Sequence, residues 1–303
     1  MSVNEAAWIL EEKGDLQVLP APYPIPEQNE IVIKHLPSSP LVQNVFSKAY
    51  IDVPYPFILG NGVAGVVEEI VEAKRDTGVG RSTWWEQSGN TAFEDAAAIP
   101  FALLTAVAAL HLKLGMGKPK SNCTGKALIW SASGSVGGYA VQYASSAGYD
   151  VVATASPQKF DYVRSLGASE VVDYKDEQVV ARLRELGPYD FVMTASGDAK
   201  GATAISDILQ PAGGKFVSTR PKNEEMHLAA NVSLLYDFFS MTTQREENAA
   251  FTTWWYSHYL PMALAGGVTP TPLERRSGGL HGIKEACEDV IAGRSPKKLV
   301  LSP

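Results

Sequence analysis

Hydrophobic and polar positions follow one pattern over the first 70 residues of the chain. Short apolar runs are separated there by prolines and glycines, which is typical of β-strands joined by turns. We expect strands at Ala6–Leu10, Gln17–Leu19 and Glu30–Lys34. A further strand is expected over Phe57–Ile70, whose internal glycines indicate a bulge or a barrel corner. The first part of the chain is therefore predicted to be β-rich.

From Phe93 onward the pattern is helical and then alternates. Helical spacing predicts helices over Phe93–Ile99 and, after Pro100, over Leu103–Leu114. Short apolar runs then alternate with helical segments, which predicts a parallel, doubly wound sheet. The expected strands of this sheet are Ala127–Trp130, Asp150–Thr154, Tyr189–Thr194 and Lys215–Ser218, and its expected helices are Tyr139–Ala147 and Ala199–Leu209. The tail has a mixed pattern, with helices expected over Phe251–Leu264 and Gly282–Ala292 and a last strand over Lys298–Leu301.

A glycine turn joins the first strand of this alternation to its helix. Gly134 and Gly137 permit a tight turn and a close approach of backbone N–H groups to a pyrophosphate at the helix N-terminus. A strand, a glycine turn, a helix and a second strand in this order predict a dinucleotide site, with a purely structural turn as the alternative. The residues expected to contact the cofactor are Ser133, Gly134, Ser135, Val136 and Gly137.

The end of the second strand bears on which dinucleotide binds. An NAD site usually has Asp or Glu about 20 residues after the glycines, to hold the ribose 2′-OH. The corresponding segment here, Ala155–Lys159, contains no acid. Ser156 and Lys159, with Tyr174 further along, can instead receive a 2′-phosphate through charge-assisted hydrogen bonds. We therefore expect NADP(H), and the alternative role for Lys159 is that of a solvated helix residue.

Length, charge and cysteine usage narrow the class of protein. The 303 residues suffice for two modest domains, and a net charge of −7 with a pI near 5.3 argues against a nucleic-acid surface or a polybasic membrane anchor. No run of about 18 apolar residues and no leader pattern is recognised, so we expect a cytoplasmic protein. Two cysteines, Cys123 and Cys287, cannot form a disulfide framework or a multi-cysteine zinc site.

Several segments together resemble the medium-chain dehydrogenase/reductase superfamily. They are the proline-rich Pro20–Pro26, the segment Ile58–Gly65, the glycine turn and Ala153–Pro157. Within that superfamily the chain is most similar to the zinc-free quinone-reductase-like branch, especially to fungal trans-acting enoyl reductases. The resemblance implies a Rossmann domain over residues 111–239 and a GroES-like β domain built from residues 1–110 and 240–303.

The resemblance also assigns roles to residues of the cofactor site. Members that prefer NADP place a Ser, a Lys and a Tyr around the 2′-phosphate, and Ser156, Lys159 and Tyr174 match this arrangement. Thr105 matches a threonine near the nicotinamide, and the alternative is a helix-start hydroxyl that caps its own backbone.

Two departures concern the catalytic machinery. Zinc-dependent relatives hold catalytic zinc with a Cys and a His of the GroES-like domain, but no Cys precedes Cys123, so we expect no metal. An Asn-Pro-x-Asp-x-Lys segment of the enoyl reductases, whose lysine has been assigned a part in catalysis, corresponds here to Ser39–Asn44. Asn44 replaces that lysine; it can donate a hydrogen bond to an enolate oxygen but cannot supply a proton at pH 7. Tyr50 and Tyr55 are the candidate proton donors.

A third departure is a truncation of the GroES-like domain around residues 71–92. The lost strands leave barrel edges that another element or a subunit must cover. The short segment that remains carries Trp84 and Trp85, which either fill the vacated core or line the pocket. Phe238, Phe239 and Trp254 are further candidates for a pocket that suits a bulky apolar substrate, and the alternative is that these aromatic residues belong to the core.

Three functions remain open on the sequence. The first is an NADPH-dependent reductase of an activated C=C or C=O bond in a polyketide-like or other small apolar substrate of secondary metabolism. The second is a non-redox cyclase, pericyclase or isomerase on the same fold, with structural NADP. The third is a non-enzymatic partner that docks on a polyketide synthase. The family expectation is a monomer or a homodimer.

Overall fold

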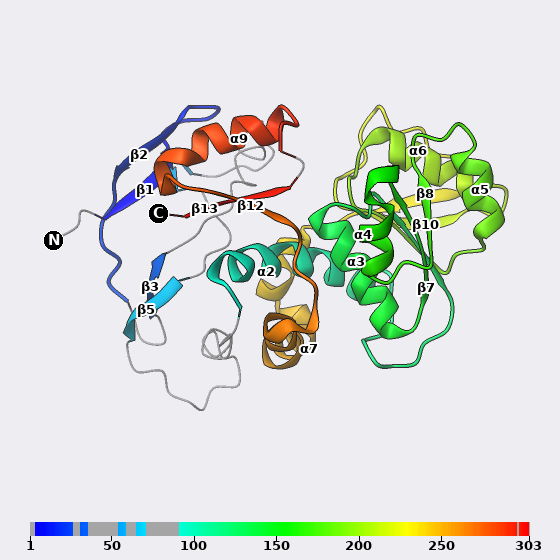
Figure 1. The fold of residues 1–303 in the computed structure, drawn as a ribbon, viewed down its shortest axis with the longest axis horizontal. Helices are drawn as coiled ribbons and strands as arrows, with labels where there is room; N and C mark the ends of the chain where they lie inside the picture. The colour runs from blue at the N-terminus through cyan, green and yellow to red at the C-terminus, as the bar shows by residue number, and fades with distance from the viewer. Residues whose placement is uncertain are drawn as a thin grey trace. The chain divides into compact units, whose positions relative to one another are not determined.

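The computed structural model describes residues 4–26, 31–35, 54–58, 65–70, 91–295 and 297–302. Its contacts divide the chain into two compact units (Figure 1). The first unit contains Met1–Phe101 together with Thr253–Pro303, and the second contains Ala102–Thr252. The expected domain boundaries were after residues 110 and 239.

The first unit contains strands from the start of the chain. β1 (Glu5–Ile9) pairs antiparallel with β2 (Leu16–Pro20) and with β4 (Phe57–Ile58). β3 (Ile31–His35) pairs antiparallel with β5 (Gly65–Ile70), and the register shifts between Val32 and Ile33 so that Glu68 has no partner. One bulge therefore lies at a glutamate of β5, because one extra residue of this strand interrupts the pairing. Gly60 and Gly62 of the expected strand lie outside the described residues.

The end of the chain completes the core of the first unit. β12 (Leu273–Arg276) and β13 (Lys298–Leu301) pair in parallel, with η8 (Gly279–Gly282) and α9 (Ile283–Ile291) as their crossover. Side chains from both chain ends are buried in one cluster, so the two ends stabilise each other. Its buried members are Ala7, Leu16, Ile283, Ala286, Cys287, Leu299 and Leu301.

Two long helical stretches cross the boundary between the units. α2 (Phe93–Val107) continues into the π-helical η2 (Ala108–Lys113). The predicted break at Pro100 is wrong: the helix runs through this residue, because burial of neighbours such as Ile99 and Leu103 compensates for the missing N–H. The second stretch is formed by α7 (Ala249–Trp254), η6 (Trp255–Tyr259), α8 (Leu260–Met262) and η7 (Ala263–Gly267).

Residues 93–113 are also apolar and long enough to cross a membrane, by length and composition alone. In this structure 67% of that window is buried, and the buried core helix of a folded protein has the same composition.

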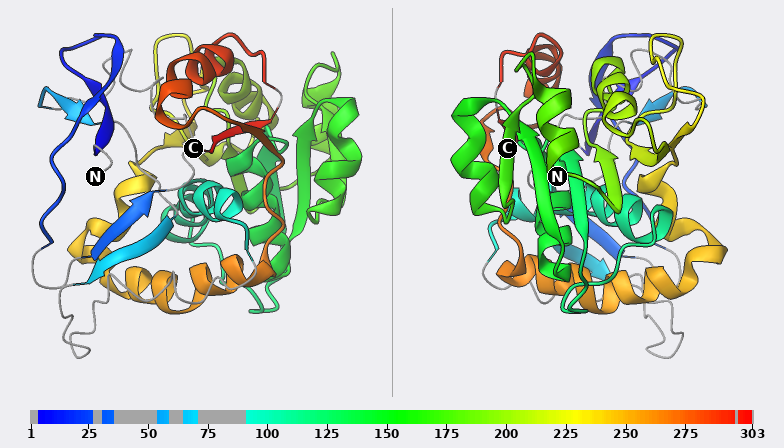
Figure 2. Two further views of the ribbon diagram at one scale, coloured as in Figure 1. Left: turned by 60° about the vertical axis from the view of Figure 1, so that its left-hand side comes forward. Right: turned by 90° about the vertical axis from the view of Figure 1, so that its right-hand side faces the viewer.

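A six-stranded parallel sheet forms the centre of the second unit, which confirms the predicted doubly wound fold (Figure 2). Its order is β11-β10-β9-β6-β7-β8. The sequence pattern did not predict β8 and β11. The strands are β6 (Lys126–Trp130), β7 (Asp150–Ala155), β8 (Glu170–Asp173), β9 (Phe191–Thr194), β10 (Gly214–Ser218) and β11 (Val232–Leu235).

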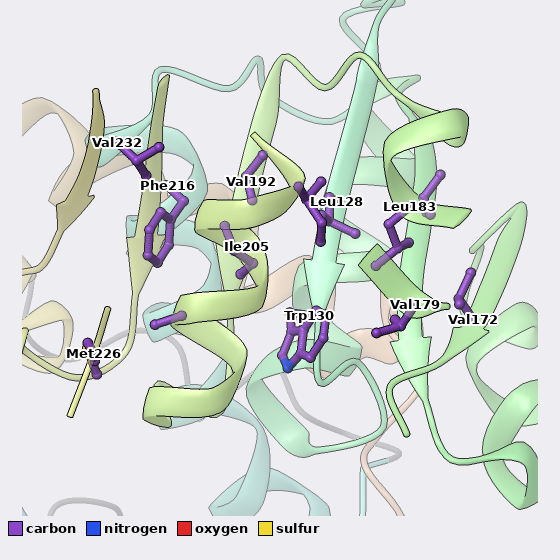
Figure 3. Packing of buried hydrophobic residues seen from close by; sticks show 13 residues of the cluster. Leu128, Trp130, Val172, Val179, Leu183, Val192, Ile205, Phe216, Met226 and Val232 are labelled. Atoms are coloured by element: carbon purple, nitrogen blue, oxygen red, sulfur yellow. The ribbon is translucent and has the colours of Figure 1, made fainter. Parts of the chain in front are cut away.

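Helices cover both faces of this sheet. α3 (Ser135–Ala147) contacts β6 and β7, and η2 contacts β9 and β10. On the opposite face α5 (Val179–Leu186) and α6 (Ala199–Ile208) bury Leu183 and Ile205 against strand residues such as Leu128 and Phe216 (Figure 3). The remaining helical elements of this unit are η3 (Pro157–Lys159), α4 (Phe160–Ser165), η4 (Phe239–Gln244) and η5 (Glu246–Asn248).

Candidate cofactor site at the carboxyl edge of the parallel sheet

The turn between β6 and α3 is anchored to the neighbouring strand β7. Ser131 has a φ of 66°, unusual for a residue other than glycine, and its N–H donates to Thr154 Oγ1 at 2.9 Å. The N–H of Ala132 donates to Thr154 O at 2.8 Å. These two hydrogen bonds hold the turn at the carboxyl edge of the sheet.

The two glycines of this turn have different structural roles. A Cβ on Gly137 would collide with the backbone, lying 2.7 Å from Ala132 Cα and even closer to Ser131 O. Gly137 is therefore required for the packing of α3 against the turn. A Cβ on Gly134 would meet no atom within 4 Å, and φ of −80° suits any residue. Gly134 thus borders open space, not a neighbouring segment of the chain.

The N-terminus of α3 faces this open space. Gly134 is the N-cap residue and offers no side-chain hydrogen bond to the first-turn N–H groups. Ser135 and Val136 are the first helical residues, and Ser133 lies partly buried just before them. The positive end of a 13-residue helix, left without a side-chain cap, suits a phosphate group. The predicted pyrophosphate residues therefore form one continuous turn whose geometry fits such a group.

The ends of β7 and β8 form a second part of the site. The register pairs Ala155 with Asp173, so Ser156 and Tyr174 follow directly on adjacent strands. Lys159 ends the short helix η3, its N–H donating to Ser156 O at 2.8 Å, and it makes no ion pair with a described residue. The carboxyl end of β7 bears no acid.

Lys175 is a neighbour of this site that the sequence reasoning missed. Its ammonium lies 5.7 Å from the centre of the Tyr174 ring, which itself packs against the buried cluster beneath the sheet. The side chain is exposed. Its position directly after Tyr174 was the only available sequence signal.

The turn after β9 borders the glycine turn, since β9 and β6 are adjacent strands. The N–H of Gly197 donates to Thr194 Oγ1 at 3.2 Å, and Asp198 caps α6 by accepting from the N–H of Gly201 at 2.8 Å. A Cβ on Gly201 would lie 2.6 Å from Trp130 Nε1, so this glycine allows α6 to pack on β6. The helices that follow β6 and β9 cover opposite faces of the sheet. Open α/β sheets bind ligands in the crevice at the carboxyl ends of two such strands.

The structure places Thr105 near the carboxyl end of α2, where it is 8% exposed. The alternative role as a helix-start cap is therefore wrong, because α2 begins at Phe93 and does not restart after Pro100. Tyr55 is partly buried, just before β4. Four further candidates, Asn44, Tyr50, Trp84 and Trp85, lie outside the described residues.

The aromatic candidates fall into two groups. Phe238 and Phe239 follow β11 in the second unit, and both rings make edge contacts with Tyr236, at centroid distances of 5.7 and 6.4 Å. Phe238 is 44% exposed, whereas Phe239 is buried. Trp254 belongs to the first unit, where its ring stacks on Tyr259 at 5.0 Å.

An ion-pair network holds the segment that carries Phe238. Both oxygens of Asp237 accept from Arg245, at 2.7 and 3.0 Å, and Lys113 lies 3.5 Å away. The hydrogen bonds from Arg245 are the main cause of the lowered pKa of Asp237. Burial, followed by the charge of Asp237, raises the pKa of Tyr236. Sequence reasoning missed this network because Lys113 ends η2, far along the chain from Asp237 and Arg245.

Among the residues that the structure describes, no three or more His, Cys, Asp or Glu side chains are grouped so that they could hold a metal ion.

A glycine turn on a doubly wound sheet defines a class of nucleotide-binding α/β enzymes, and comparisons with known proteins place the chain within it. Residues 135–245 match the family described as zinc-binding dehydrogenase. The dehydrogenase pigH of Monascus ruber is 30% identical across 100% of both chains. The trans-enoyl reductase himH of Aspergillus japonicus is 29% identical across 99% of this chain and 97% of its own. The quinone oxidoreductase of Escherichia coli, solved in complex with NADPH, has a TM-score of 0.75 at 19% identity and full coverage of both chains.

The chain therefore belongs to the medium-chain dehydrogenase/reductase superfamily and is an oxidoreductase of the reductase type, as its motifs predicted. The alignment with the Monascus protein extends over 370 positions, more than the 303 residues of this chain. That relative thus contains segments that this chain lacks, while the placement of the truncation around residues 71–92 remains a prediction.

Proposed function

We propose that the protein is an NADPH-dependent reductase of an activated C=C or C=O bond in a polyketide-like or other small apolar substrate. The observation that carries this proposal is the carboxyl end of β7 and β8. There Ser156 and Tyr174 directly follow the paired residues Ala155 and Asp173. Lys159 makes no ion pair with a described residue, and no acid ends β7. This donor set suits a 2′-phosphate, and β7 does not end in the carboxylate that usually holds a ribose 2′-OH. Asp173, at the end of β8, instead accepts a hydrogen bond from the N–H of Lys175 at 3.0 Å.

Each part of the site has a defined task in this proposal. The uncapped N–H groups of α3 and the open space beside Gly134 receive the pyrophosphate. Bound NADPH supplies the hydride. Either Thr105 or Asn44 is the proposed donor to the oxyanion that develops on the substrate, and Tyr50 is the proposed proton source.

The substrate class is supported by two observations. The similar fungal protein himH is named a trans-enoyl reductase, and enoyl groups are activated C=C bonds. Phe238 exposes an aromatic ring beside Tyr236 in the second unit, which suits contact with an apolar molecule. A polyketide synthase is the proposed source of such a substrate.

Titration calorimetry with NADPH and NADH tests this proposal. The wild-type protein should bind NADPH at least ten times more tightly than NADH. Lys159→Met should raise the Kd for NADPH about 10- to 100-fold, because one charge-assisted hydrogen bond contributes about 1.5 to 3 kcal/mol. The Kd for NADH should not change, since NADH has no 2′-phosphate.

Lys175→Met is the matched control, since Lys175 is a second lysine at this edge of the sheet and follows β8. Its ammonium lies over the Tyr174 ring, so its removal should change the Kd for NADPH less than Lys159→Met does. Equal binding of NADH and NADPH by the wild-type protein would contradict the proposal.

The second candidate is a non-redox cyclase, pericyclase or isomerase, which the presence of Asn44 in place of the family lysine favours. A substrate held in one conformation needs no proton donor at that position. Asn44→Lys separates the two functions. If the chain is a reductase whose proton donor was altered, Asn44→Lys should increase NADPH oxidation with enone probes. If it is an isomerase, no enone should support NADPH oxidation in either protein.

A further inference from the structure

Arg220 occupies a fixed position at the carboxyl edge of the sheet. It is the second residue after β10, and its N–H donates to Ser218 Oγ at 3.1 Å. The preceding Thr219 donates from its N–H to Thr194 O at 3.3 Å and from its hydroxyl to Ala195 O at 3.0 Å. The turn that carries Arg220 is therefore tied to the turn that follows β9.

The stem of Arg220 packs on the backbone of Gly197. This glycine has a φ of +59°, and a Cβ there would lie 2.8 Å from the Cβ of Arg220 and 2.9 Å from its Cγ. Only glycine leaves room for the arginine stem. Because Gly197 lies in the turn after β9, and β9 is the neighbour of β6, the stem of Arg220 extends from β10 over the turn that borders the glycine turn.

The guanidinium of Arg220 has no anionic partner among the residues that the structure describes. The carboxylate of the adjoining turn, Asp198, already accepts from Ser196 and from the N–H of Gly201. By contrast, the guanidinium of Arg245 binds Asp237 at 2.7 Å. An exposed arginine head on a stem held by packing is well suited to bind an oxyanion from outside the chain, since little side-chain freedom remains to be lost.

The order of the strands indicates which anion this is. The proposed 2′-phosphate site lies at β7 and β8, on one side of β6, whereas Arg220 lies at β10, on the other side. A dinucleotide whose pyrophosphate rests on the glycine turn after β6 must extend its nicotinamide half toward β9 and β10. Neighbouring strands are about 4.8 Å apart, so β6 lies about 10 Å from β10, and the stem of Arg220 crosses the first of these two intervals.

We propose that Arg220 binds the nicotinamide-side phosphate of the cofactor pyrophosphate, opposite the N-terminus of α3. This inference rests on the proposed NADPH-dependent function. It assigns the cofactor a cationic contact from β10 in addition to the backbone N–H groups of the glycine turn. Arg220 then sets the affinity for the whole dinucleotide but not the choice between NADPH and NADH.

Calorimetry with two ligands tests the assignment. NADPH carries both phosphates of the pyrophosphate, whereas adenosine 2′,5′-bisphosphate carries the 2′-phosphate and the adenosine-side phosphate only. Arg220→Gln should raise the Kd for NADPH about tenfold and leave the Kd for the bisphosphate unchanged. Lys159→Met should weaken the binding of both ligands. Lys222→Gln, which removes another exposed cation two residues further along, should change neither.

The remaining outcomes separate this inference from the function on which it rests. Unchanged NADPH binding by Arg220→Gln would overturn the role of Arg220 and leave the proposed function intact. An equal rise in Kd for NADPH and the bisphosphate would also overturn the role of Arg220, because the bisphosphate lacks the nicotinamide-side phosphate. Unchanged thermal unfolding of Arg220→Gln would show that the variant keeps its fold. If the wild-type protein binds neither NADPH nor NADH, the proposed function fails together with the inference.

Discussion

Single residues at the margins of the core carry energetic consequences that the sequence pattern alone does not show. Lys298 begins β13 and is partly buried, and it makes no ion pair with a described residue. Burial lowers its pKa from 10.5 to about 8. The folded protein thus binds fewer protons here than the unfolded chain between pH 8 and 10.5, so stability rises with pH across this interval.

Replacing Lys298 with Met should therefore stabilise the protein at neutral pH. The variant keeps an apolar stem of similar length and removes the buried charge, a gain of at most about 3 kcal/mol. This gain should be complete below pH 8 and should disappear as the pH rises to 10.5. Denaturant unfolding of both proteins at about pH 7 and about pH 10 measures it. An equal gain at the two pH values would show that packing, and not the charge, is responsible.

At the scale of elements, α3 shows how one short motif serves both folding and binding. Gly137 is buried where the helix meets the turn after β6, while Gly134 is exposed at the helix N-terminus. The two glycines cannot be told apart in the sequence motif. In the structure only Gly137 lies against other backbone atoms, whereas Gly134 has none within 4 Å of a Cβ placed on it.

Alanine at Gly137 should lower stability, whereas alanine at Gly134 should weaken cofactor binding. Gly137→Ala forces a Cβ against the backbone of Ser131 and Ala132, and it should cost about 1 to 3 kcal/mol of folding free energy. Gly134→Ala should change stability by less than about 0.5 kcal/mol but should weaken NADPH binding, because the Cβ occupies the space proposed for the pyrophosphate. Thermal unfolding and calorimetry on both variants distinguish these outcomes. Strong destabilisation by Gly134→Ala would contradict the open space at this residue.

The helix α2 illustrates where a local rule fails at this same scale. Pro100 predicts a boundary, and it does lack an N–H, yet the helix continues from Phe93 to Val107. Ala98, Leu103 and Ala106 are fully buried. Burial of side chains on both sides of the proline outweighs the lost hydrogen bond. The local sequence around Pro100 does not show how deeply these side chains are buried.

At the scale of the whole molecule, the first unit depends on both ends of the chain. Leu301, near the C-terminus, is buried in one cluster with Ala7 of β1 and Cys287 of α9. The second unit has a separate core, which includes Leu183 of α5. A substitution that destabilises one core should therefore unfold its own unit before the other.

Leu301→Ala should destabilise the first unit by about 2 to 5 kcal/mol, the usual effect of such a truncation in a core. Hydrogen exchange should show lost protection in β1, α9 and β13, while the strands β6 and β7 remain protected. Leu183→Ala is the matched control and should reverse this distribution. Uniform loss of protection in both variants would mean that the two units unfold as one.

The sequence by itself determined the parallel sheet, the glycine turn after β6 and the absence of an acid at the end of β7. These features depend on hydrophobic period and on residue type within a short stretch of chain, so they can be read without knowledge of distant contacts. It also identified Ser156, Lys159 and Tyr174 as a set, through resemblance to a family.

The tertiary structure decided the rest. Three features each involve separate strands or turns: the pairing of Ala155 with Asp173, the open space beside Gly134 and the packing of Arg220 on Gly197. Such contacts depend on strand order and pairing, which join residues far apart in the chain, and no local pattern encodes them.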